Sequence, residues 1–153
     1  MDIFSHGLYG GIATGRKSKK DYFTALFFGL GPDLLAFGPF ILATLLGFHS
    51  WTADGLVNYL YNATHSFVVY APFFVLFWIF GGKNFAKLTL AWPLHILVDI
   101  PTHSAEFFPT HFLWPITNFS VDGISWTKPV IFIPNIAIIL TLYLYWYVSS
   151  RKN

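Results

Sequence analysis

The sequence has no cysteine and few charged residues. Without cysteine, disulfide bonds and thiolate metal ligands are both excluded, so any metal ion must be bound by histidine, carboxylate or water. Charged residues make up 10% of the 153 residues and hydrophobic ones 55%, which is far from the composition of soluble domains. The composition therefore predicts a single integral-membrane domain covering residues 1–153.

Three motifs of common enzymes are also missing: the serine nucleophile elbow, the phosphate-binding loop and the dinucleotide fingerprint. For an enzyme, this leaves metal-assisted chemistry. The formal net charge of +2 says little about partners. We expect the lipid bilayer as the surrounding partner and no nucleic acid.

Apolar blocks predict four membrane spans, roughly residues 22–48, 65–80, 85–102 and 129–148. A bilayer core of about 30 Å takes about 20 helical residues to cross. Residues 1–15 are too short to span, and Gly7, Gly11 and Gly15 recur in them at the spacing of closely packed helices. The prediction is an all-α polytopic membrane protein with four transmembrane helices and an N-terminal half-helix, the alternative for the half-helix being a flexible glycine-rich terminus.

The basic residues cluster in three groups that fall on one side of these spans. One group precedes the first span, one separates the second and third, and one follows the fourth: Arg16, Lys17, Lys19 and Lys20; Lys83 and Lys87; Arg151 and Lys152. The two connections on the other side carry one lysine between them. By the positive-inside rule, both termini are predicted to be cytoplasmic.

The third predicted span contains His95, Asp99 and His103 at intervals of four residues. On a helix this spacing stacks the side chains along one face, where they can converge on one ion or substrate. Pro101 frees a backbone carbonyl and predicts a bend between Asp99 and His103. Polar groups at this depth are costly, which favours a functional role.

Asp33 follows Gly31 and Pro32 in the middle of the first predicted span. Proline removes a backbone donor and glycine loosens a helix, so we predict that the helix is broken there. The carboxylate could simply begin a new half-helix. Because broken membrane helices usually line a site, we favour a functional role for Asp33.

Depth connects these residues with two further histidines. At about 1.5 Å per residue from the basic surface, most of them lie roughly 12 to 24 Å into the membrane. Alone, His65 could be an interfacial histidine and His6 a residue without a role. Together they complete a candidate metal site: His6, Asp33, His65, His95, Asp99 and His103.

Three residues outside the candidate metal site have open roles. His49 is expected to be a solvated loop histidine, and for His111 solvation and function are equally open. Glu106 follows His103 by three residues and either reaches the same site or faces water.

Histidines and aspartates in a dry setting fit Zn²⁺, Mn²⁺ or Fe²⁺ better than Ca²⁺ or Mg²⁺. Such an ion activates a water molecule for hydrolysis. Two alternatives stay open: an intramembrane transporter of metal ions or protons, and a non-catalytic scaffold whose polar residues pair between helices.

Residues 5–104 resemble a family of inner-membrane metal-dependent hydrolases of bacteria and archaea, domain of unknown function 457. The pieces that carry the resemblance are Ser5-His6-Gly7, Gly31-Pro32-Asp33, Thr64-His65-Ser66, and His95-x-x-x-Asp99 followed by Pro101-Thr102-His103-Ser104. The resemblance implies a prokaryotic inner membrane. Tyr61 and Asn62 stand where that family often has a His-Arg pair.

The order of the polar residues is also similar, more distantly, to the zinc-dependent phospholipase C and P1 nuclease family, whose metal cluster cleaves phosphate esters. This resemblance implies five metal ligands: His6, Asp33, His65, His95 and Asp99. It also implies that a further site begins at His103 and that Asp99 bridges ions. The family's later His-x-x-x-Glu is missing, because Pro115 stands four residues after His111. We therefore expect one or two ions, zinc first and manganese or iron otherwise. The expected substrate is a phosphoester of a lipid or lipid-linked molecule, with Asp33 and Asp99 as catalytic carboxylates.

Overall fold

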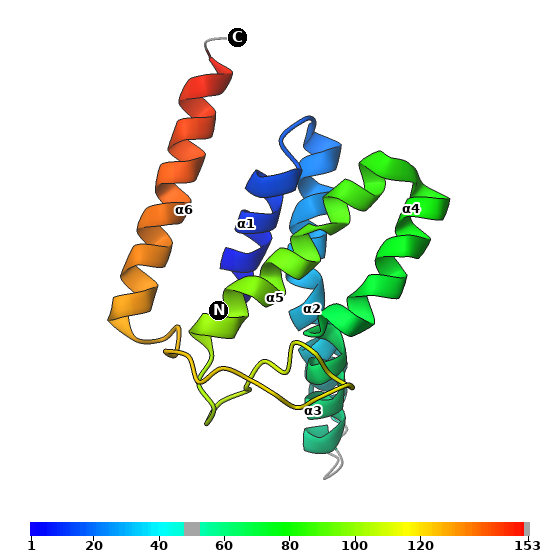
Figure 1. The fold of residues 1–153 in the computed structure, drawn as a ribbon. Helices are drawn as coiled ribbons and strands as arrows, with labels where there is room; N and C mark the ends of the chain where they lie inside the picture. The colour runs from blue at the N-terminus through cyan, green and yellow to red at the C-terminus, as the bar shows by residue number, and fades with distance from the viewer. Residues whose placement is uncertain (48–52, 152–153) are drawn as a thin grey trace.

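The computed structural model describes residues 1–47 and 53–151, and these ranges form six α-helices and no strand (Figure 1). The helices are α1 (Ile3–Thr14), α2 (Lys19–Leu45), α3 (Ala53–Thr64), α4 (Phe67–Thr89), α5 (Ala91–Thr102) and α6 (Pro129–Ser150). The predicted all-α class is confirmed. His49, Lys152 and the predicted end of the first span at Phe48 lie outside the described residues.

Three stretches are long and apolar enough to cross a membrane: Lys19–Leu45, Phe67–Thr102 and Pro129–Ser150. The predicted count of four spans is not confirmed, because the second and third predicted spans both fall within Phe67–Thr102. A positive φ of 76° at Gly82 divides α4, and α5 has 12 residues, a length of about 18 Å. That length is well short of the roughly 30 Å of a bilayer core.

The N-terminal segment is helical and lies against α2, as predicted, and is not a flexible terminus (Figure 1). Small residues allow the two backbones to approach closely. A Cβ atom at Gly10 would lie 2.7 Å from the Ala25 carbonyl oxygen, and one at Gly29 would lie 2.5 Å from that of His6. At these positions only glycine fits, as expected for close packing of membrane helices.

The predicted break at Asp33 is wrong, since α2 continues through Pro32 and Pro39 without interruption. Proline removes one backbone donor, which a long helix tolerates when neighbouring groups satisfy the freed carbonyls. Pro32 leaves the Phe28 carbonyl without its helical donor. The neighbouring carbonyl of Gly29, one turn before Asp33, is contacted by His95, whose Nδ1 lies 2.7 Å from its oxygen. Helix α2 is therefore continuous at the point where His95 contacts its backbone.

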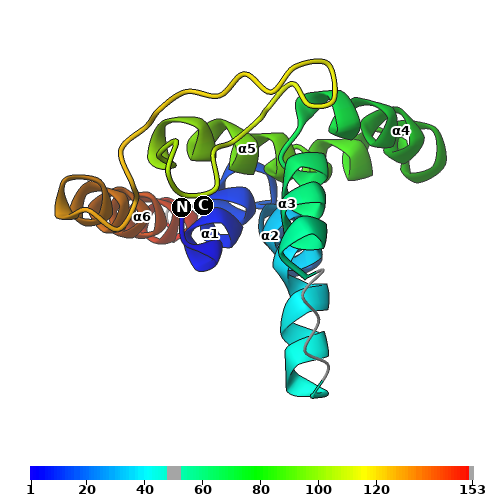
Figure 2. The same ribbon diagram turned by 90° about the horizontal axis from the view of Figure 1, so that it is seen from below.

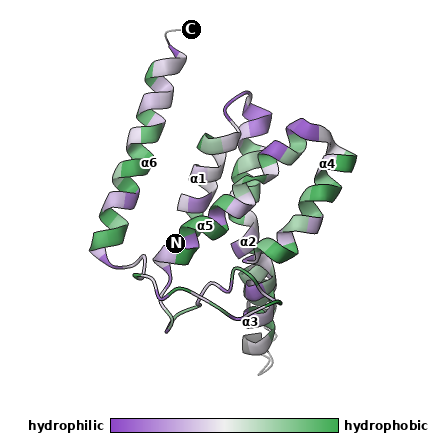
Figure 3. Ribbon diagram, viewed as in Figure 1, coloured by the Kyte–Doolittle hydropathy of each residue, from purple (hydrophilic) through white to green (hydrophobic). Residues whose placement is uncertain are grey.

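The two ends of the molecule differ in polarity. The α1–α2 connection, the bend of α4 and the end of α6 lie at the same end, and the first two are strongly hydrophilic (Figures 1 and 3). Residues 103–128 cross the opposite end as a long connection between α5 and α6 (Figure 2). The return of this connection is fixed by hydrogen bonds to the end of α5, where Gly123, Ile124 and Trp126 donate N–H groups to the carbonyls of His103, Pro101 and Thr102 at 2.9 Å each.

Candidate metal site

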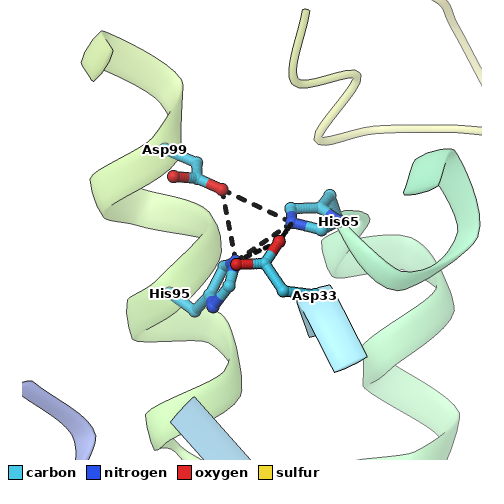
Figure 4. Close-up of side chains that lie close together, drawn as sticks. All are labelled: Asp33, His65, His95 and Asp99. Atoms are coloured by element: carbon cyan, nitrogen blue, oxygen red, sulfur yellow. Dashed lines mark hydrogen bonds and ion pairs between the residues drawn. The ribbon is translucent and has the colours of Figure 1, made fainter. Parts of the chain in front are cut away.

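Four side chains converge where α2, α5 and the α3–α4 junction meet (Figure 4). They are Asp33, His65, His95 and Asp99, and each offers a ligand atom within 4.8 Å of those of the others. His65, His95 and Asp99 are at most 1% exposed, and the side chain of Asp33 is 12% exposed. This arrangement of two carboxylates and two imidazoles can hold a metal ion.

The α5 helix supplies two of these groups directly. His95 and Asp99 are four residues apart, so they project from one face, and His95 Nε2 lies 3.2 Å from Asp99 Oδ2. Asp33 approaches from α2, with its Oδ1 3.4 Å from His65 Nε2 and 3.8 Å from His95 Nε2. Three separate segments are therefore needed to complete the cluster.

His65 lies in the short break between α3 and α4, and its neighbours in the Thr-His-Ser motif fix that break. Ser66 is the N-cap of α4, and its hydroxyl accepts from the N–H of Val68 at 3.1 Å. The carbonyl of Thr64 accepts a hydrogen bond from Trp92 Nε1 at 2.7 Å. The motif thus holds an imidazole where one helix ends and the next begins.

Hydrogen bonds to backbone carbonyls decide which nitrogen of each imidazole carries the proton. His95 Nδ1 lies 2.7 Å from the Gly29 carbonyl, and His65 Nδ1 lies 3.0 Å from the Tyr61 carbonyl. Since a carbonyl only accepts, both Nδ1 atoms carry hydrogen and both Nε2 atoms present lone pairs in the neutral rings. The two Nε2 atoms are 3.0 Å apart, and a cation between or beside them removes the resulting repulsion.

Asp99 lies between two groups of histidines. Its Oδ2 faces His65 and His95 at 3.4 and 3.2 Å. Its Oδ1 faces His6 Nε2 at 2.9 Å and His103 Nδ1 at 3.3 Å, and the amino group of Met1 also contacts it. His6 stacks on His95 with ring centroids 3.5 Å apart. Both carboxylate oxygens of Asp99 therefore face histidine nitrogens.

Several buried polar atoms in the described part of the chain have close polar neighbours but form no hydrogen bond of good geometry, and they cluster here: both ring nitrogens of His6, Asp99 Oδ2 and His103 Nδ1. Buried polar groups are normally satisfied, so such a concentration indicates a missing ligand. Within residues 1–47 and 53–151, no lysine or arginine forms an ion pair with Asp33 or Asp99. Imidazole nitrogen with carboxylate oxygen is a donor set that suits a transition-metal ion.

A cavity of about 450 Å³ adjoins the cluster. Its polar wall includes Asp33, Tyr61 and His103, and the remainder is largely apolar, with Leu34 and Phe108 among the lining residues. Because Asp33 belongs to both the cluster and the cavity, a molecule in the cavity would meet the cluster at this carboxylate.

The six predicted site residues fall into two sets. Four form the cluster, and His6 and His103 join it through Asp99. The predicted helical stripe is incomplete: α5 ends at Thr102, and His103 follows in extended backbone with φ −112° and ψ 138°. The returning loop takes the carbonyls at this end of α5, although His103 still reaches Asp99.

The structure also places two of the residues whose roles were open. His111 lies away from the cluster, where its Nδ1 bonds to Asn62 Oδ1 at 2.8 Å. Glu106 is exposed, as the alternative of a solvated carboxylate predicts.

Tyr61 is a site neighbour to which sequence reasoning assigned no role. Its ring stacks on His65 with centroids 3.9 Å apart, and its hydroxyl pairs with Thr110 at 3.2 Å. Burial raises the pKa of Tyr61 well above its usual value, so the hydroxyl stays protonated. The spacing of four residues before His65 on a helix was the available signal.

The chain matches no protein-family model, no curated protein and no solved structure. The geometry of the cluster is therefore the basis for the functional proposal.

Proposed function

We propose that the chain is a membrane-embedded metal-dependent hydrolase that cleaves a phosphoester of a lipid or lipid-linked substrate. The observation that carries the proposal is the pair of Nε2 atoms of His65 and His95, 3.0 Å apart beside two carboxylates. A divalent transition-metal ion would relieve the repulsion and add positive charge beside the two carboxylates. We expect zinc, with manganese or iron as alternatives.

The ligands of one ion would be Asp33, His65, His95 and Asp99. His6 and His103 face the other oxygen of Asp99, so a second ion there would share this carboxylate. An ion held by these groups acts as a Lewis acid and lowers the pKa of a water molecule toward neutrality. One or two ions therefore fit the residues.

The carboxylates have different roles in this proposal. Asp99 is at the centre of the histidines and is fully buried, so it holds and orients the ligand groups. Asp33 also lines the cavity, where it can take a proton from the attacking water. The water oxygen then bonds to phosphorus, the ester P–O bond breaks, and the proton returns to the departing alkoxide.

The adjoining cavity supports a lipid substrate. Its wall combines the polar edge of the cluster with apolar side chains of α2 and of the α5–α6 connection. A phosphoester group would lie against Asp33 while a hydrocarbon chain occupies the apolar part. The resemblance in sequence supports a prokaryotic inner membrane as the location in this proposal, and the basic groups at one end support cytoplasmic termini.

The transport alternative has less support than hydrolysis. It relied on a helix broken at Asp33, which is typical of carriers, and α2 is continuous there. The scaffold alternative predicts a folded protein that binds no metal.

The test uses detergent-purified protein loaded with Zn²⁺ or Mn²⁺ in mixed micelles that contain phosphatidylglycerol, phosphatidic acid or a polyprenyl phosphate. We expect metal-dependent release of the hydrolysed product from one of these, detected by mass spectrometry. Asp33→Asn should lower turnover by about 10²-fold or more, the range of a lost general base. Asp122→Asn is the matched control, because Asp122 lies in the α5–α6 connection and accepts from Ala105 N.

Two results would overturn the proposal. Absence of bound transition metal in wild-type protein would favour the scaffold. Metal flux into proteoliposomes that disappears in Asp33→Asn, without hydrolysis of any of the lipids, would favour transport.

A further inference from the structure

Two further cavities lie at the basic end of the molecule. They share no lining residue with the cavity beside the metal cluster. The first has a volume of about 380 Å³, and its walls include Arg16, Lys17, Lys87, Trp146, Ser149 and Ser150. The second has a volume of about 450 Å³ and is lined by Arg16, Ser18, Lys19, Tyr22, Phe23 and Trp146. Arg16 and Trp146 belong to both, so the cavities adjoin.

Three segments that are far apart in the sequence form this region. They are the α1–α2 connection, the last turn of α4 and the last turns of α6, which lie at the same end of the molecule (Figure 1). The Trp146 ring is held by stacking on Tyr22, with centroids 5.6 Å apart, and by an edge contact with Tyr143. The aromatic wall is therefore shared between α2 and α6.

The two cavities differ in the chemistry of their walls. In the first, three exposed cations, two from the α1–α2 connection and one from α4, line one hollow together with serine hydroxyls, which favours an anion. In the second, the aromatic rings of Tyr22, Phe23 and Trp146 provide an apolar wall beside the same arginine. Basic pockets between helices at the positive end of membrane proteins suit lipid headgroups, and tryptophan is typical of this level.

We propose that these adjoining cavities bind an anionic phospholipid, with its phosphate at Arg16, Lys17 and Lys87 and its glycerol and upper acyl chain along the wall of Tyr22, Phe23 and Trp146. The site does not depend on the metal cluster or on hydrolysis. Free phosphate shares the headgroup chemistry, but it would leave the aromatic cavity unused. The bound lipid would connect α6 to the α1–α2 connection.

The test measures lipid binding to full-length protein in dodecylmaltoside micelles by native mass spectrometry and by thermal unfolding. The variant is the triple Arg16→Gln, Lys17→Gln, Lys87→Gln. The matched control removes three charges from the same end without touching either cavity: Lys20→Gln, Lys83→Gln, Arg151→Gln. Metal content of both variants serves as a check that the remainder of the protein is folded.

We expect phosphatidylglycerol to bind wild type and to raise its unfolding temperature, with phosphatidylcholine much weaker. The cavity triple should bind phosphatidylglycerol at least about tenfold more weakly, and the control triple should lose little. Trp146→Ala should also weaken phosphatidylglycerol binding with all charges retained.

Equal losses in the two triples would overturn the proposal, because they would show general attraction to a basic surface. Inorganic phosphate that stabilises wild type as well as phosphatidylglycerol does, with no effect of Trp146→Ala, would assign a free-anion site instead.

Discussion

The packing of α1, α2 and α5 contrasts with the packing of α6. The first three helices meet through glycines and enclose fully buried histidines and an aspartate. Along α6 only Asn135 and Ile139 are buried, although this helix is apolar over most of its length. In a membrane, apolar side chains gain nothing by leaving lipid for a protein interior, so small and polar residues decide which surfaces meet.

The contacts of α6 show the same principle on a smaller scale. Asn135 donates to Ser5 Oγ at 2.8 Å and accepts from Tyr9 at 2.9 Å, and Tyr143 donates to the carbonyl of Leu8 at 2.9 Å. A few polar groups thus attach α6 to α1, while the functional cluster lies on the other helices. The comparison predicts large effects from changes in the first region and small ones from changes in α6.

The largest effect is expected for Asp99→Ala. Four histidines face this carboxylate, so its removal should lower bound metal by more than the roughly 10- to 100-fold typical of losing a hydrogen-bond partner of a ligand. Elemental analysis of purified protein measures the change. Asp122→Ala should retain the metal of wild type, and retention by Asp99→Ala would show that this carboxylate is no ligand.

The next largest effect is expected for Gly29→Ala. The new methyl group would lie 2.5 Å from the His6 carbonyl oxygen, so α1 must shift, at a cost of about 1–3 kcal/mol. Gly31→Ala is the matched control, because its Cβ would have no atom within 4 Å outside its own helix. Unfolding by denaturing detergent in mixed micelles gives both free energies. Equal stability of the two variants would argue against the close approach of α1 and α2.

A smaller effect is expected for Asn135→Leu, which removes two hydrogen bonds between α6 and α1. The cost should be about 1 kcal/mol of unfolding free energy, with bound metal unchanged. Thr141→Val is the control, since the Thr141 hydroxyl bonds within its own helix to Ala137. A loss of metal in Asn135→Leu would contradict the separation of α6 from the site.

The smallest effect is expected for His111→Ala. This side chain makes one hydrogen bond, to Asn62 outside the cluster, so its loss should cost about 0.5 kcal/mol and leave the metal content as in wild type. His65→Ala, one of the four cluster residues, should by contrast lose most of the metal. Equal metal content in the two variants would contradict the distinction between them.

Sequence reasoning found the polar residues but not how each reaches the others. The spacing of His95 and Asp99 on one helix predicted their contact, because helical periodicity is local. The contact of Asp33 with His65 could not be predicted in this way, since it depends on how α2 meets the α3–α4 junction. Asn135 went unnoticed, although a lone amide in an apolar helix was a readable signal.

The expectations about helix ends failed for a related reason. Pro32 predicted a break that the helix does not show, whereas Pro101 lies in the last turn of α5. The two prolines differ in their surroundings. Helix α2 continues past Pro32, where it packs beside α1 and His95. At the end of α5, by contrast, the returning loop binds the backbone carbonyls.

The sequence by itself determined that the chain is helical and apolar and that any metal must be bound by histidine, carboxylate or water. These properties follow from composition and from the periodicity of a single helix. Only the tertiary structure decided that Asp99 lies between two groups of histidines and that α1 lies close enough to bring His6 to it. Such contacts depend on the absence of side chains at Gly10 and Gly29, where two backbones meet, and no local pattern specifies the partner.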